Sequence, residues 1–241
     1  MEFNKKASNP ALAIGYFFQG LQLLLNSSLR TFVIIPVLIN IVLYSVALTL
    51  GYYYMADLID QFIPSWLQWL NWVLWPVFFV SFFIAGFFTF TVLANLLAAP
   101  FYGILSAKTL SLLTQQTVSS QEQPLPKVML AEVNRAWYLL TRAVPLVILS
   151  FIPGVNVVAP VLWALFGAWG MALEYMAYPL ENAGVLFAEQ KSLLKSIRLG
   201  ALSFGGVAVM GLALPIVNII VAPAAVVGAT IYFHAVRVGE Q

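Results

Sequence analysis

The spacing of charged side chains limits what this chain can fold into more than any other feature of its sequence. Five long stretches contain no Asp, Glu, Lys or Arg. The first, 7–29, has several polar residues, whereas the other four, 31–56, 61–107, 143–173 and 199–236, are predicted to face the membrane. A soluble domain carries about 25% charged residues because its surface must be solvated, whereas only 8% of the residues here are charged. With 62% hydrophobic residues, the chain is excluded from the water-soluble globular and disordered classes and is predicted to be an integral membrane protein.

Two of the uncharged stretches predict full transmembrane helices. A spanning helix needs about 20 apolar residues, and 31–56 meets this length and has three consecutive tyrosines near its end, which suit the headgroup interface. The stretch 61–107 is too long for one helix. Its first part has a tryptophan at every third position and predicts a short interfacial helix that ends at Pro76, and 77–99 predicts the second span, which ends at Pro100.

The other two stretches, 143–173 and 199–236, each have proline and asparagine at the centre. The two centres are Pro153–Pro160, which contains Asn156, and Pro215–Pro223, which contains Asn218. Proline breaks helices, and the arms beside each centre hold roughly 10 to 16 residues, too few to span at about 1.5 Å each. Both stretches therefore predict re-entrant hairpins, whose broken backbone must be buried in protein or face water. A single kinked span is the alternative for each.

The positions of the basic residues favour hairpins that return to the side they entered from. The link 57–76 carries two Asp and no Lys or Arg, so all eleven basic residues lie elsewhere in the chain. If both hairpins return, every Lys and Arg falls on one face, and the positive-inside rule places that face and both termini in the cytoplasm. Two full spans per stretch give the same sidedness but need longer arms. The segment 101–142 then predicts a cytoplasmic helical hairpin, within a single membrane domain covering 1–241.

The sequence lacks the short motifs that mark catalysis and nucleotide binding. It has no P-loop, no dinucleotide-binding glycine pattern and no HExxH motif. It has no cysteine, which excludes disulfides and thiolate metal sites. The single histidine, His234, is typical of an interfacial side chain, with a metal or proton role as the alternative. We therefore expect no enzyme, no metal and no cofactor, and the net charge of +2 gives no indication of a nucleic-acid partner.

One candidate anion site lies just before the first predicted span, in the segment 26–31. Ser27 or Ser28 is suited to cap the helix, so that free amides and the positive helix end face one spot. Arg30 adds a fixed charge with a forked set of donors. Such a combination is typical of sulfate or phosphate sites. The alternative is an arginine that sets the topology and extends to the lipid headgroups.

A second group of charges lies in the polar segment before the stretch 143–173. Arg135 and Arg142 are seven residues apart and share a helix face, and Glu132 is placed to pair with Arg135 three residues later. One interpretation is a charged vestibule that attracts or passes anions, and the other is an ion-paired cytoplasmic helix. Glu174 follows thirty-one uncharged residues and is either a proton-linked carboxylate or an interfacial residue.

Short stretches of one known family occur in family order through nearly the whole chain. They are Gly20–Leu24, Leu29–Asn40, Ala98–Phe101, Arg142–Ala143, Phe151–Asn156, Ala159–Trp163, Phe166–Trp169, Tyr178–Pro179 and Gly228–Thr230. With these stretches the chain resembles the CysZ family of bacterial inner-membrane sulfate transport proteins. The resemblance implies sulfate uptake into the cytoplasm for cysteine synthesis. It also implies two long transmembrane helices, hairpins that only partly penetrate, and an oligomer in the lipid membrane.

The resemblance further implies which residues handle sulfate. The family's anion-binding stretch maps onto Ser28, Leu29, Arg30 and Thr31, and its later charged cluster maps onto Glu132, Arg135 and Arg142. The chain departs from the family pattern at two of these positions. The family often has a second arginine where Thr31 stands and a glycine where Ser28 stands.

The leading functional prediction is a sulfate transporter or channel. Because a dianion is costly to dehydrate, its path must supply donors or water throughout, and we expect the hairpin centres at Asn156 and Asn218 to line it. The shortage of internal charge favours a homo-oligomer whose subunits together enclose a wet path. The alternative function is a non-transporting membrane scaffold or a regulatory subunit of another transporter.

Overall fold

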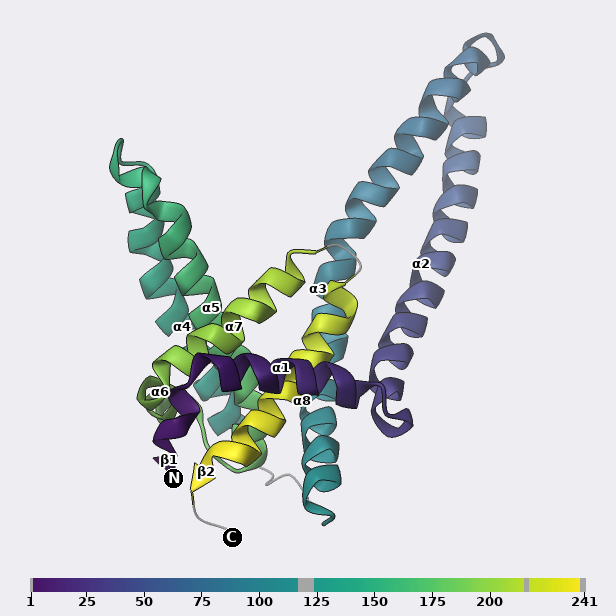
Figure 1. Ribbon diagram of the computed structural model, residues 1–241. Helices are drawn as coiled ribbons and strands as arrows, with labels where there is room; N and C mark the ends of the chain where they lie inside the picture. Colours follow the sequence, from purple (N-terminus) through teal and green to yellow (C-terminus); the bar gives the residue numbers. More distant parts are fainter. Residues whose placement is uncertain (1, 117–123, 215–216, 239–241) are drawn as a thin grey trace. The chain divides into compact units, whose positions relative to one another are not determined.

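The computed structural model describes residues 2–116, 124–214 and 217–238, and most of these residues are helical. The α-helices are α1 (Pro10–Leu24), α2 (Ser27–Phe62), α3 (Asn71–Thr114), α4 (Leu125–Ser150), α5 (Ala159–Asn182), α6 (Phe187–Ser196), α7 (Arg198–Leu212) and α8 (Asn218–Val236) (Figure 1). Short 3-10 helices lie at Lys5–Ser8, Ser65–Leu70 and Val155–Val157, and the two-residue strands β1 (Glu2–Phe3) and β2 (Arg237–Val238) pair antiparallel. The prediction of a helical membrane protein is confirmed. In the described part of the chain, three helical segments are long and apolar enough to cross a membrane, namely Ser27–Phe62, Ser65–Gly86 and Asn218–Val236.

The chain forms two compact units, one of Met1–Phe32 with Tyr102–Gln241 and one of Val33–Phe101. In the first unit, α8 is surrounded by α1, α5 and α7. A Cβ atom on Gly20 of α1 would collide with the backbone of α8 at Ala224 and Gly228. The absence of a side chain at Gly20 therefore allows the two helix backbones to approach closely, as is common between membrane helices.

The second unit consists of most of α2 and α3 and is held by contacts between large side chains. The Tyr44 hydroxyl donates to the carbonyl oxygen of Gly86 at 3.0 Å, and the rings of Tyr52 and Trp75 stack with centroids 4.7 Å apart. No part of the most apolar stretch of α2, or of Ser65–Gly86, is buried within the chain. These helices thus present apolar surface outward on most sides, which suits contact with lipid.

The helices of the second unit are longer than the predicted spans. The helix α2 extends past residues 31–56 at both ends and includes Asp57 and Asp60. The tryptophan-rich segment is a 3-10 helix that ends at Leu70, and α3 continues through both Pro76 and Pro100. The predicted helix ends at these two prolines are therefore wrong. A proline removes one backbone donor, and a long helix tolerates this loss where the turns on both sides stay bonded.

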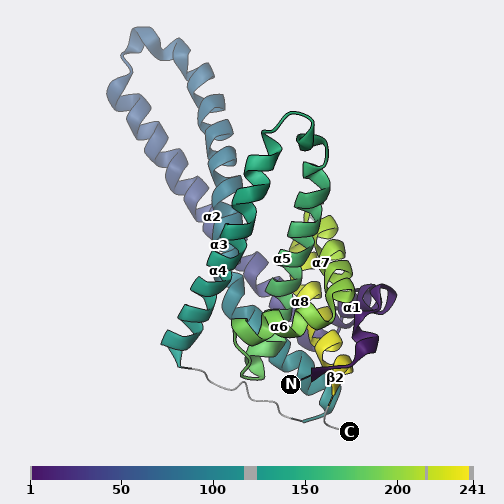
Figure 2. The ribbon, with the colours of Figure 1, turned by 90° about the vertical axis from the view of Figure 1, so that its left-hand side faces the viewer.

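The first proline-centred stretch folds as two helices joined by a turn. Figure 2 shows α4 and α5 side by side, joined by residues 151–158, and the Trp163 Nε1–H donates to the Ser150 hydroxyl across the pair at 3.1 Å. The turn contains Gly154 at φ 85°, a backbone conformation that side chains disfavour. In the second stretch α7 precedes α8, which begins at Asn218 and continues through Pro223, so the predicted break at Pro223 is wrong. Pro215 lies outside the described residues. The segment limits predicted at 142 and 173 fall inside α4 and α5.

Candidate functional site

The predicted anion segment forms the first turn of α2, and Asn26 caps it. The Asn26 Oδ1 accepts the backbone N–H of Ser28 at 3.0 Å, and the Asn26 carbonyl accepts the N–H groups of Leu29 and Arg30, both at 3.0 Å. The cap is therefore Asn26, one residue before Ser27 and two before Ser28, the two residues that were predicted to cap the helix. Asparagine is among the best N-cap residues because its side chain reaches the second amide of the helix. Three amides of this turn, those of Ser28, Leu29 and Arg30, were expected to be free and are instead bonded to Asn26.

The side chains of this turn divide by burial. Leu29 is fully buried and anchors the turn, whereas Ser28, Arg30 and Thr31 are exposed. The Thr31 hydroxyl donates to the Ser27 carbonyl at 3.5 Å, which is long for such a bond. Arg30 forms no ion pair with any carboxylate in the described part of the chain. Its guanidinium donors are thus available to a ligand.

Arg135 lies at the centre of a polar cluster formed by α4, α5 and α6. Its side chain is only 7% exposed, and its Nη1 lies 3.0 Å from Oε1 of Glu132. Its Nη2 donates to Oε1 of Glu181 at 2.9 Å and to Oε1 of Gln190 at 3.0 Å. Glu174 completes the group, with its Oε2 at 3.8 Å from Nη1. We call these five residues the Arg135 cluster.

The Arg135 cluster carries more negative than positive charge. Partial burial raises the pKa of the Glu132 carboxyl, Arg135 lowers it, and the neighbouring Glu181 and Glu174 raise it. Because three carboxylates share one guanidinium, Arg135 is neutralised and does not act as a fixed positive charge for a dianion. Within the described residues no group of His, Cys, Asp or Glu is arranged to hold a metal ion.

The other predicted pathway residues lie apart from this cluster. The guanidinium of Arg142 stacks 3.6 Å over the ring of Tyr138 and donates through Nη1 to the Tyr138 carbonyl at 3.1 Å. Asn156 lies in the 3-10 turn between α4 and α5, and Asn218 is the first residue of α8; both are exposed. In the chain segments that the structure describes, no hydrogen bond connects either asparagine to the Arg135 cluster. The spacing of Arg135 and Arg142 correctly predicted that they share a helix. It did not show that Arg135 pairs with carboxylates whereas Arg142 contacts Tyr138.

Two members of the Arg135 cluster were missed from the sequence. Glu181 is 46 residues from Arg135 and Gln190 is 55, so no local spacing connects them. Gln190 is 1% exposed, and its Nε2 donates to the Val185 carbonyl at 2.9 Å, which fixes the side chain towards Arg135. Glu181 lies two residues after Tyr178–Pro179, one of the stretches that resemble the family, but the resemblance assigned it no role. Gln190 lies outside all of those stretches.

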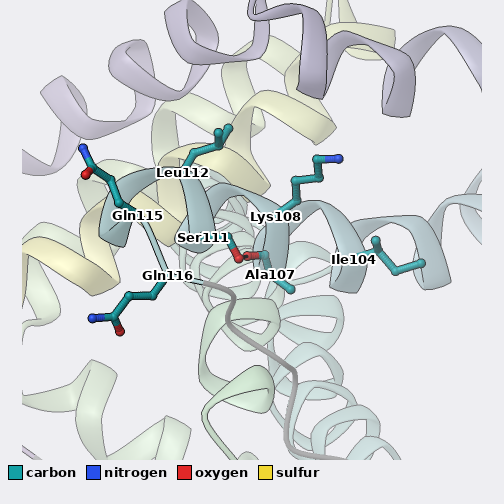
Figure 3. A pocket seen from close by; sticks show the side chains of 7 residues that line it. All are labelled: Ile104, Ala107, Lys108, Ser111, Leu112, Gln115 and Gln116. Carbon is teal, nitrogen blue, oxygen red and sulfur yellow. Dashed lines mark hydrogen bonds between the residues drawn. The ribbon is translucent and has the colours of Figure 1, made fainter.

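A shallow surface depression of about 530 Å³ follows one face of α3. Its lining residues are Ile104, Ala107, Lys108, Ser111, Leu112, Gln115 and Gln116. Figure 3 shows Lys108 and Gln115 extending from the helix, with Ser111 between them along its length. None of the predicted site residues lines this depression, and we assign it no role.

The helical architecture, the glycine-mediated helix contact and the outward apolar faces define an α-helical integral membrane protein. A sequence comparison identifies the group. The chain belongs to the family described as Sulfate transporter CysZ/Etoposide-induced protein 2.4, whose family model matches residues 16–223. This match confirms the resemblance to the CysZ family that was found in the sequence.

The chain is similar over most of its length to proteins named sulfate transporter CysZ. A relative from Pseudomonas syringae pv. tomato is 39% identical over 231 residues, covering 90% of each chain. One from Pseudomonas fluorescens is 39% identical over 239 residues, covering 94% of each. One from Pectobacterium atrosepticum is 37% identical over 233 residues, covering 93% of this chain and 85% of the relative.

Proposed function

We propose that this protein takes up sulfate across the bacterial inner membrane and supplies it for cysteine synthesis. The observation that carries the proposal is the similarity to named sulfate transporters over nearly the whole chain, at 36–39% identity. The relatives are named for transport, and we propose transport without catalysis for this chain as well. The apolar helices, with few charges inside them, fit a protein that moves a small anion through the membrane.

We propose that sulfate is first bound at the start of α2, by Arg30 with Ser28 and Thr31, while Leu29 holds the turn in place. Arg30 has no carboxylate partner in the described residues, so binding a dianion breaks no existing ion pair. Because the amides of Ser28, Leu29 and Arg30 are bonded to Asn26, side chains supply most of the donors. The positive end of the helix adds a favourable field.

For the path beyond this turn, we propose the arrangement expected from the sequence. In addition to the two full spans, residues 143–173 and 199–236 form partly penetrating hairpins, with Asn156 and Asn218 lining a watery route. The termini and the charged residues Glu132, Arg135 and Arg142 lie on the cytoplasmic side. Because one chain offers few internal donors for a dianion, the route is enclosed by a homo-oligomer embedded in lipid.

Uptake of radioactive sulfate by sealed vesicles that contain the purified protein tests the proposal. Wild type is expected to admit sulfate well above the leak of protein-free vesicles. Charged hydrogen bonds contribute about 1.5–3 kcal/mol, so Arg30→Ala is expected to weaken sulfate binding about 10- to 100-fold, with partial retention in Arg30→Lys.

The matched control is Lys195→Ala, because Lys195 is an exposed cation of α6. This substitution is expected to leave sulfate uptake unchanged. If wild-type vesicles admit no more sulfate than empty ones, transport is excluded and the scaffold alternative takes its place. If Arg30→Ala binds sulfate as tightly as wild type, the site at α2 is wrong although transport stands.

A further inference from the structure

An apolar stripe runs along one side of α4 and is left uncovered by the rest of the chain. In the described residues α4 packs mainly against α5 and α6, through a face that includes the buried residues Ala131 and Arg135. The stripe lies on another face, and each of its side chains is at least 45% exposed. We call it the α4 stripe, and its members are Leu130, Val133, Trp137, Leu140, Val144 and Val147.

The members of the α4 stripe follow one another at alternating distances of three and four residues. Phe151, which caps α4 and is 81% exposed, continues this spacing. Apolar residues spaced in this way form the seam along which one helix packs against a second helix. The charged residues Glu132, Arg135 and Arg142 fall between the members and outside the seam. The stripe is therefore a helix-packing surface without a partner helix in its own chain.

Lipid tails do not account for the first half of the α4 stripe. The Glu132 side chain is 48% exposed, and Arg142 is exposed as well, so charged groups lie beside this half on the surface of the same helix. Charged groups are costly inside hydrocarbon. Among the described helices, α4 is not one of those apolar and long enough to cross a membrane. A contiguous apolar surface outside the hydrocarbon typically marks a contact with another protein.

We propose that the α4 stripe packs against the same stripe of a second copy of this chain. Two copies inserted into the membrane in the same direction have parallel α4 helices, so each member meets its own counterpart around a two-fold axis. The positions that flank the stripe carry no charge, so pairing brings no like charges together. These positions are Met129, Asn134, Ala136, Thr141, Ala143 and Ile148. The inference rests on the homo-oligomer of the proposed function and names the face through which it forms.

The area of the α4 stripe is sufficient for a stable contact. At their exposed fractions of 45–81%, the six members and Phe151 offer on the order of 800 Å² per copy, which is about what each partner contributes to a standard interface. Ala136 and Ala143 lie beside the stripe, and small residues let two helix backbones approach closely. Because Arg135 lies on the packed face of α4, the contact leaves the Arg135 cluster intact.

Disulfide cross-linking in isolated membranes tests the contact, and the chain has no cysteine of its own to interfere. Val133→Cys, Leu140→Cys and Val147→Cys are each expected to give a cross-linked dimer under mild oxidation, since equivalent seam positions face each other in a parallel pair. Arg142→Cys is the matched control, because Arg142 is exposed on the same helix but outside the seam, and about tenfold less dimer is expected there. Equal yields at the seam and control positions would overturn the inference.

Native mass spectrometry of the purified full chain gives a second measurement. Leu140→Arg places two like charges face to face and is expected to weaken the dimer at least about tenfold. Leu199→Arg, at an exposed leucine of α7, is the control and is expected to leave the dimer unchanged. An unchanged dimer in Leu140→Arg would overturn the inference.

Lipid is the competing occupant of the α4 stripe. A bimane label attached to the thiol of Leu140→Cys is expected to be shielded from brominated lipids by the second copy. Strong quenching of this label would show that lipid covers the stripe, and the inference would be overturned. Sulfate uptake by wild-type vesicles is read separately. Its failure with intact cross-linking would overturn the proposed function alone, and failed cross-linking with intact uptake would overturn this contact alone.

Discussion

The helices α8 and α2 are both apolar enough to cross a membrane, but they pack in different ways. In α8, 67% of the most apolar stretch is buried within the chain, and in α2 none is. The buried helix meets its neighbours at glycines, as at Gly20 and Gly228, whereas α2 meets α3 through large rings such as Tyr52 and Trp75. Lipid is as apolar as a leucine side chain, so hydrophobicity alone does not bring membrane helices together, and close packing of small residues does.

The largest expected effect is the loss of close packing in Gly20→Leu. The new side chain would collide with the backbone at Ala224 and Gly228, and backbone does not move aside as a flexible side chain does. We expect a loss of about 3 kcal/mol in the free energy of unfolding, the upper part of the range for overpacked cores, measured by thermal unfolding in detergent. Gly15→Leu on the same helix is the control, since a Cβ there meets nothing within 4 Å. Equal stability of the two variants would contradict glycine-mediated packing.

Arg135→Met is expected to have the next largest effect. It leaves Glu132, Glu174 and Glu181 facing one another without a cation. Breaking a buried ion pair costs about 3–5 kcal/mol, and we expect about 2–3 kcal/mol here because the glutamates are partly exposed to water. The loss is expected to be greater at pH 8 than at pH 5, where carboxylates begin to protonate. Arg142→Met, which removes no carboxylate partner, is expected to cost less, and an equal cost would argue against the cluster as a stabilising unit.

A pair of tyrosines sharpens the comparison between the units. Tyr232→Phe in α8 removes the donor to the buried Ala7 carbonyl, and an unsatisfied buried acceptor costs about 1–3 kcal/mol. Tyr44→Phe removes the bond to Gly86 in the α2–α3 unit, whose helices are mostly unburied. For that variant we expect about 0.5 kcal/mol, as for polar contacts between membrane helices. Thermal unfolding of both variants measures the difference, and a larger cost for Tyr44→Phe would reverse the comparison.

The smallest expected effect concerns pH. Because the pKa of Glu132 is raised above its ordinary value of 4.5, chiefly by burial, its ionised form is less favourable in the folded than in the unfolded chain. Its contribution to stability is therefore present at low pH and is lost as the pH rises through the raised pKa. Between pH 4.5 and neutrality, Glu132→Gln is expected to weaken the dependence of the unfolding temperature on pH. Glu132→Asp keeps a carboxyl group and is expected to retain that dependence. An unchanged slope in Glu132→Gln would assign the dependence to another group.

Much of the secondary structure could be predicted from the sequence, but its limits could not. The breaks at Pro153–Pro160 and before Asn218 are present, and Glu132 pairs with Arg135 as their spacing indicated. By contrast, Pro100 does not end α3, because proline removes only one bond from a helix whose other turns continue. The helix α1 was also missed as a packing element. Because polar residues are spread along α1, its sequence did not indicate that one side of the helix packs against α7 and α8.

The sequence by itself determined the class of protein, because long uncharged stretches have few stable solutions besides helices in a membrane. It also determined the Glu132–Arg135 contact, since residues three apart on a helix are neighbours. Only the tertiary structure decided that Glu181 and Gln190 neutralise Arg135 and that Arg142 and Lys191 share the Tyr138 ring. Helical periodicity reports neighbours on one helix, whereas these contacts join three helices, and their partners are set by how those helices pack.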